Sequence, residues 1–145
     1  MSDRFALDDA AAAALFGIAH APTESMGALY AQGEGYARTP TLTRYGGSSV
    51  RGTLSVPPGS LRALFHNHPS VRGADTERAR FSQDDRDMAN RLKVPSYISA
   101  GDRVMRYASG QTEEVLAQFP IEEWRAQIMR TILNRAPDDP RGALR

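Results

Sequence analysis

The chain has 145 residues, of which 41% are hydrophobic and 24% charged, and this is the composition of one ordinary globular domain. The net charge of +1 provides no general attraction to nucleic acids or membranes, so we expect neither as a partner. The absence of cysteine excludes disulfides and thiolate metal ligands, so any metal must be held by His, Asp, Glu and water. With no recognisable signal peptide, cytoplasmic residence is the default expectation, although specialised secretion would leave no such mark.

A helix is predicted over residues 10–20. Its alanine run has high helix propensity, and Asp8 and Asp9 in front of it would stabilise the positive end of the helix dipole. His20, near the C-terminal end, is either an extra metal ligand or an ordinary helix residue, and we favour the second interpretation. The apolar side chains of this region share one stripe that should pack on a sheet, namely Leu7, Ala11, Leu15 and Ile18.

Runs of apolar and β-branched residues then predict several strands. The first covers residues 24–31, and Gly33-Glu34-Gly35 is a hairpin turn that leads into residues 36–38. A half-buried strand is expected over residues 50–56, and a buried strand over residues 61–65. The later elements are a strand hairpin, a last strand and a helix with one apolar face, over residues 94–100 with 103–109, 113–119 and 121–135.

This order of helices and strands predicts an α+β fold with a mixed sheet between helices. We expect one domain over residues 1–135 and a loose tail over residues 136–145, which contains two prolines and no apolar stripe. The oligomeric state cannot be read from the sequence.

Two histidines follow the buried strand. Because side chains alternate along a strand, His66 and His68 point to the same side, and Pro69 prevents the strand from continuing. Two imidazoles on one side can provide two ligands of a zinc site. The pair alone is weak evidence, since many such pairs are simply polar residues at the end of a strand.

The next element supplies a third ligand. Residues 82–92 predict a helix with Ser82 at the N-cap, acids in the first turn and bases in the last. Asp85 is then the third helical residue, and its carboxylate can point back toward the histidines. Asp84 is the competing ligand, but it is rotated by about 100° around the helix. Ser82 and Asp85 alone are most often only a capping box.

The pattern His66-x-His68-Pro69 followed by Ser82-x-x-Asp85 resembles the signature of the JAMM (MPN+) zinc metalloproteases. That family also has a glutamate at the start of an upstream strand, followed by a glycine and hydrophobic residues, and Glu24 with Gly27 matches this feature. The resemblance covers residues 24–107. It implies a cytidine-deaminase-like JAB/MPN fold.

The resemblance also implies a role for each residue. His66, His68 and Asp85 would hold Zn²⁺, with water in the fourth position. Glu24 would take a proton from that water and pass it to the leaving amine, while Ser82 would donate its hydroxyl to the tetrahedral oxyanion. The implied reaction is hydrolysis of a peptide or isopeptide bond in a protein or peptide substrate. The family's substrates make a ubiquitin-like modifier joined to a target the leading candidate.

One departure from the family pattern lies between the second histidine and the aspartate, which are 17 positions apart, a longer gap than usual. A similar long gap ending in Phe-Ser-x-x-Asp looks like the JAB-like domains associated with bacterial polymorphic toxins. The extra residues, 70–80, are polar and of mixed charge. They form either a solvated loop or a lid that recognises the substrate.

Two alternative functions stay open. A toxin or effector protease acting on host proteins or cell-wall peptides would use the same chemistry on another substrate. A catalytically silent scaffold of the same fold would usually have lost its metal ligands, whereas this chain has all of them. The metal itself is also open, because other first-row divalent ions can occupy such a site.

Overall fold

The computed structural model describes residues 4–19, 21, 23–43, 54–68, 80–100 and 102–134. Within these residues the chain forms three helices and one seven-stranded sheet. The helices are α1 (Arg4–Phe16), α2 (Gln83–Leu92) and α3 (Ile121–Asn134). The strands are β1 (Ser25–Gln32), β2 (Gly35–Arg38), β3 (Leu42–Thr43), β4 (Leu61–His68), β5 (Ser96–Ala100), β6 (Arg103–Tyr107) and β7 (Glu114–Ala117).

The sheet is mixed. Its strand order is β2-β1-β4-β5-β6-β7, and β3 pairs with β1. The pair β4 and β5 is parallel, and the other pairs among the described strands are antiparallel. Parallel neighbours need a crossover connection, and α2 is the helix of that crossover. The first turn of α2 therefore lies near the C-terminal end of β4.

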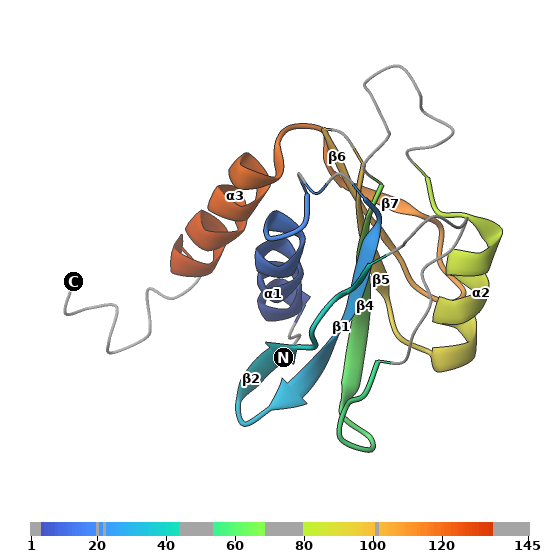
Figure 1. The fold of residues 1–145 in the computed structure, drawn as a ribbon. Helices are drawn as coiled ribbons and strands as arrows, with labels where there is room; N and C mark the ends of the chain where they lie inside the picture. The colour runs from blue at the N-terminus through green and yellow to red at the C-terminus, as the bar shows by residue number, and fades with distance from the viewer. Residues whose placement is uncertain are drawn as a thin grey trace.

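The helices cover both faces of the sheet (Figure 1). α1 and α3 lie together on one face, and α2 lies on the other. The larger apolar core fills the space between the sheet and the α1/α3 pair, and a smaller cluster lies under α2. The predicted α+β architecture with a mixed sheet between helices is confirmed. Among the described residues, no helix is long and apolar enough to cross a bilayer.

The first helix begins earlier than predicted. It starts at Arg4, so Asp8 lies inside α1 and not in front of it. The Asp8 carboxylate is buried, accepts a hydrogen bond from the Tyr97 hydroxyl at 2.6 Å and lies 3.5 Å from the Arg4 guanidinium. The prediction that Asp8 stabilises the helix N-terminus is therefore wrong, because a contact with the sheet holds this carboxylate. The predicted apolar stripe does pack on the sheet, with Leu15 completely buried.

Most of the other predicted elements agree with the structure. The β1–β2 hairpin turns at Gly33, whose φ of +57° suits glycine. The β5–β6 hairpin and β7 form, and the apolar side of α3 is buried through Ile121, Trp124 and Ile128. The strand predicted over residues 50–56 is an exception, because residues 54–56 are not in a strand and residues 50–53 lie outside the described part. The tail over 136–145 also lies outside it.

A close packing contact joins β1 and β4. Gly27 is paired with Phe65, and the Phe65 ring covers Gly27 so closely that an added Cβ would lie 2.5 Å from Cζ of the ring. Phe65 is completely buried. The glycine of the upstream motif therefore has a packing role here: it lets the histidine strand lie against the strand that follows Glu24.

Candidate metal centre

His66 and His68 lie at the C-terminal end of β4, on the face covered by α2. Both side chains point to this face, as the alternation predicted, and their Nε2 atoms are 3.1 Å apart. His66 is 5% exposed, and His68 is half-buried. The backbone pairing of His66 with both Met26 and Ile98 holds this part of β4 between two neighbouring strands.

Asp85 reaches the histidines from the first turn of α2. Its Oδ2 atom lies 3.3 Å from Nε2 of His66 and 3.9 Å from Nε2 of His68. The helix begins there because Ser82 is an N-cap in the extended conformation, with its side chain accepting the N–H of Asp85. In return, the backbone N–H of Ser82 donates to Oδ2 of Asp85 at 3.0 Å. This reciprocal capping box orients the carboxylate toward the imidazoles.

Two further contacts hold the N-terminal end of α2, one from Arg86 in the helix and one from Phe81 directly before the cap. The Arg86 guanidinium donates to Oε1 of Glu113 at 2.5 Å, and the side chain of Glu113 is only 12% exposed. On the side that faces the sheet, Phe81 packs edge-on against the His66 ring, with ring centroids 6.5 Å apart, and also contacts Tyr107. These contacts place α2 so that Asp85 can reach the histidines.

The spacing of the three donor atoms is compatible with a metal site. Bonds of about 2.0–2.1 Å in a tetrahedral zinc site separate neighbouring donors by about 3.3–3.4 Å. Here the three separations are 3.1, 3.3 and 3.9 Å. Within the described residues, His66, His68 and Asp85 are the group that could hold a metal ion. The same distances also fit a hydrogen bond between the two imidazoles and an ion pair between His66 and Asp85. The geometry therefore defines a candidate metal site and does not identify the metal.

The electrostatics favour an anionic ligand at Asp85. Burial works to raise the pKa of this carboxyl, but the hydrogen bond and charge of His66 and the N–H of Ser82 hold that pKa well below its usual range. Asp85 is therefore a carboxylate at neutral pH. One carboxylate and two imidazoles are ligands typical of zinc and of other first-row divalent metals.

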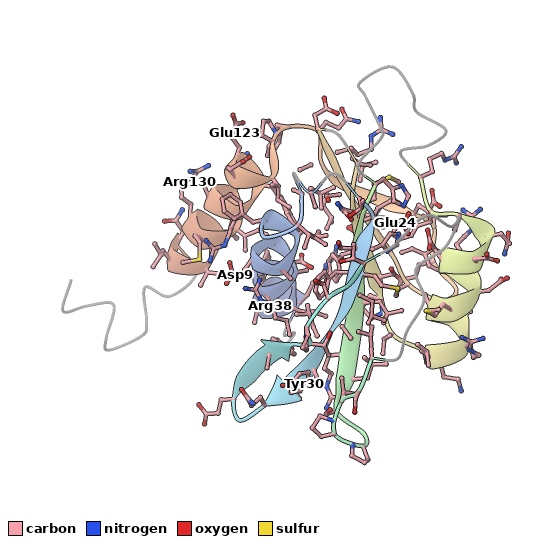
Figure 2. The ribbon with its side chains drawn as sticks, in the orientation of Figure 1. Asp9, Glu24, Tyr30, Arg38, Glu123 and Arg130 are labelled. Atoms are coloured by element: carbon pink, nitrogen blue, oxygen red, sulfur yellow. The ribbon has the colours of Figure 1, made fainter. Side chains whose placement is uncertain are left out.

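Glu24 lies at the same end of the sheet as the two histidines. It immediately precedes β1, and Figure 2 shows it at the N-terminal end of that strand. This end of β1 lies beside the C-terminal end of β4. The antiparallel register ends with the pair of Met26 and His66, so Glu24, two residues before Met26, and His68, two residues after His66, lie at the same end of the two strands. Glu24 is half-buried.

The other candidate residues either are not part of this group or lie outside the described residues. Asp84 is exposed on α2 and is not part of the metal-binding group among the described residues. His20 and residues 70–79 lie outside the described part of the chain. Arg80, the first residue described after His68, is exposed, and its Nε lies 3.7 Å from Oε2 of Glu113.

Sequence reasoning missed two residues around the site. Phe81 supports the His66 ring, and the only signal was an aromatic residue directly before the helix cap. Asn67, between the two histidines, is completely buried and hydrogen-bonds to Ile18 and Thr23 in the segment before β1 and to Ser25, the first residue of β1. The sequence around Asn67 does not indicate its hydrogen-bond partners, because these backbone groups are 42 to 49 residues away in the chain.

Comparisons with known proteins give no family assignment: no protein-family model, no curated protein and no solved structure matches the chain. The chain is therefore an α+β protein with a candidate His-His-Asp metal site, and the similarity to JAMM proteases rests on the short motifs alone.

Proposed function

We propose that this protein is a metal-dependent hydrolase of the JAMM type that cleaves peptide or isopeptide bonds, with zinc as its metal and a JAB/MPN-like fold. The observation that carries the proposal is that Asp85 of α2, 17 positions after the second histidine in the sequence, meets the two histidines of β4 at the end of that strand. Donor atoms of His66, His68 and Asp85 all lie within 4.8 Å of one another. The motif order and the α+β architecture with a mixed sheet support the same proposal.

When bound, zinc would lower the pKa of a coordinated water from about 15.7 toward about 7 and polarise the carbonyl to be cleaved. The chain's own part begins with the ligands. His66 and His68 would bind through Nε2, so both rings must be neutral with the proton on Nδ1. Asp85 supplies the negative charge, and the capping box holds its Oδ2 in place. Three protein ligands leave one tetrahedral position for water, as in catalytic zinc sites.

Glu24 is the proposed general base. From its position before β1, at the end of the sheet that carries the histidines, its carboxylate would accept a proton from the attacking water and return it to the leaving amine. A base in this position has to lie beside the ligands without being one of them. Glu24 satisfies this condition because it directly precedes β1, the neighbour of the histidine strand, and does not belong to β4 or α2.

Ser82 is the proposed donor to the oxyanion. Its Oγ accepts the N–H of Asp85 at 3.1 Å, and this bond uses a lone pair and not the hydroxyl hydrogen. The hydroxyl can therefore cap α2 and donate to a substrate oxygen at the same time. Ser82 is exposed, so a substrate can reach it. Removing one oxyanion donor typically lowers the rate by about 10²–10³.

The substrate class follows from the same resemblance. We propose that the scissile bond joins the C-terminus of a ubiquitin-like modifier to an amine of a target protein. A C-terminal modifier tail is extended and slender enough to pair with a strand edge near the site, as extended peptides do in other complexes. A toxin or effector protease would use the same metal site on an unrelated peptide.

The first test is metal content. Elemental mass spectrometry of the purified full chain should find about one zinc per molecule, and a His68→Ala variant should have lost it. An Asp84→Ala variant is the matched control, because it removes a neighbouring exposed carboxylate that is not part of the His66, His68 and Asp85 group. Wild type without metal after zinc has been offered would contradict the metal site and the hydrolase.

The second test is catalysis. Wild type with zinc should hydrolyse aminocoumarin amides attached to the C-terminal residues of ubiquitin-like proteins, screened beside unrelated peptide amides. Glu24→Gln should abolish turnover while zinc stays bound, since the amide keeps the shape of the side chain but cannot accept the proton. Undiminished turnover in Glu24→Gln would remove Glu24 from the mechanism. Cleavage of unrelated peptides only would favour the effector protease.

A further inference from the structure

Asn67 lies in β4 between the two proposed metal ligands, yet its side chain points away from them. Alternation along the strand puts His66 and His68 on the α2 face and Asn67 on the face covered by α1 and α3. Asn67 is 0% exposed. Burying a primary amide costs free energy unless its hydrogen bonds are made, so Asn67 requires partners within the protein.

Within the described residues, the Asn67 amide makes three hydrogen bonds, and each is to backbone. Its Oδ1 accepts the N–H of Ser25 at 2.6 Å, and its Nδ2 donates to the carbonyl oxygens of Ile18 at 2.8 Å and Thr23 at 3.3 Å. Two of these partners, Thr23 and Ser25, are the residues directly before and after Glu24. One side chain therefore holds the backbone on both sides of the proposed base.

The strand pairing alone does not do this. The register between β1 and β4 begins at Met26 and His66, two residues short of Glu24. On its other side, Ser25 pairs with Thr43 of the two-residue strand β3. The Asn67 side chain extends the contact between β1 and β4 toward Glu24, at the point where the backbone ladder has ended.

We propose that Asn67 is the positioning residue that sets Glu24 against the metal ligands. This inference rests on the proposed function, because it assumes that Glu24 is the base. The backbone of Asn67 connects His66 to His68, and its side-chain amide hydrogen-bonds to the residues on both sides of Glu24. A displacement of the histidines would therefore also displace Glu24. A misplacement of about 1 Å can lower the rate of an enzyme about 100-fold. Asn67 itself touches neither substrate nor metal.

The test measures the position of Glu24 relative to a metal ion and does not need a substrate. The full chain, labelled with ¹⁵N, is loaded with Co²⁺, and pseudocontact shifts are recorded for the amides of Glu24 and Ser25. Asn67→Ala should change these shifts while leaving those of Ile98, which pairs with His66 on its other side, unchanged. In the metal-free protein, exchange of the Ser25 amide with solvent should accelerate about tenfold, because its acceptor is gone.

Two further variants guard against general damage. Asn67→Asp keeps the shape of the side chain and the acceptor for Ser25 but loses both donors, so it should alter the shift of Glu24 even if Asn67→Ala does not fold. Ser99→Ala is the matched control. Ser99 pairs with Asn67 on the next strand, is buried, and its Oγ has no hydrogen-bond partner among the described residues. Ser99→Ala should leave the shifts of Glu24 unchanged.

The outcomes separate this inference from the proposed function. If the wild type shows no pseudocontact shifts, the metal site is absent and both proposals fail. If the wild type shows them and the Asn67 variants match it, only the positioning role is overturned. Loss of Co²⁺ binding in both Asn67 variants would also overturn it, since Asn67 would then hold the ligands and not the base. Where amide hydrolysis is found, Asn67→Ala should lower kcat about 10- to 100-fold with KM and zinc content unchanged.

Discussion

Ser82 and Asp85 hydrogen-bond to each other in both directions, Ser82 N–H to Oδ2 at 3.0 Å and Asp85 N–H to Oγ at 3.1 Å. The same Oδ2 atom lies 3.3 Å from Nε2 of His66. A helix cap and a candidate metal ligand therefore share one oxygen. The stability of α2 and the affinity for metal should change together when the cap is altered.

Ser82→Ala tests this coupling. Loss of the cap should lower the free energy of unfolding of the metal-free protein by about 1 kcal/mol. Alanine keeps the backbone N–H that donates to Oδ2 of Asp85, so the zinc Kd should rise only through the loosened first turn of α2, by about tenfold, the lower end of the range for residues that orient a ligand. Denaturant unfolding and competition with a zinc chelator measure the two effects.

Ser82→Asn is the control, since asparagine caps a helix as well as serine does but has no hydroxyl. It should retain stability and zinc affinity while hydrolysis stays slow, which separates the cap from the proposed oxyanion donor. An unchanged zinc Kd in Ser82→Ala would contradict the coupling.

Zinc should stabilise the fold. A ligand that binds only the native state at 100 times its Kd raises the free energy of unfolding by about 2.7 kcal/mol. We expect a higher Tm for the wild type with zinc, reversed by EDTA. His66→Ala, which removes a ligand that is 5% exposed, should show the same Tm with and without zinc. A zinc-dependent rise in His66→Ala as large as in the wild type would place the bound ion elsewhere.

Gly27→Ala should destabilise the protein. The added Cβ would lie 2.5 Å from Cζ of Phe65, whose ring is completely buried and has little room to move. Overpacking of this kind costs about 1–3 kcal/mol, measurable by denaturant unfolding. Gly35→Ala is the matched control, because a Cβ there would meet nothing within 4 Å. Equal stability of Gly27→Ala and Gly35→Ala would contradict the packing described here.

The buried carboxyl of Asp8 should make stability depend on pH. Burial raises its pKa above the ordinary 3.8, although the Tyr97 hydrogen bond and the charge of Arg4 act in the opposite direction. Burial and the neighbouring Asp8 also raise the pKa of the Tyr97 hydroxyl, which therefore keeps its proton and donates it. The charged groups that act on Asp8 come from α1, β6 and β7: Arg4, Arg106 and Glu114.

The sign of the effect follows from this raised pKa. Between pH 3.8 and the raised value, the native state binds more protons than the unfolded state, so stability falls as the pH rises through that interval. Asp8→Asn keeps an acceptor for Tyr97 and cannot ionise. The free energy of unfolding of the wild type minus that of Asp8→Asn should therefore decrease with rising pH. A difference that increases, or stays constant, would contradict the raised pKa.

Local sequence patterns determined most of the elements. Alternation along a strand predicted that His66 and His68 share a side, and the N-cap preference of serine predicted where α2 begins and that Asp85 lies at its third position. These properties depend only on neighbours in the chain. The error at α1 has the same origin, because the acids before the alanine run suggested a helix end, while a partner on β5 holds Asp8 inside the helix.

Only the tertiary structure decided which distant groups meet. The crossover from β4 through α2 to β5 brings Oδ2 of Asp85 within 3.3 Å of His66, and the antiparallel pairing of β1 with β4 brings the start of β1, with Glu24 before it, to the same end of the sheet as His68. The partners of Asn67 and the contact of Gly27 with Phe65 arise in the same way. Strand pairing and packing select contacts by shape and burial over the whole chain, so local spacing in the sequence does not specify them.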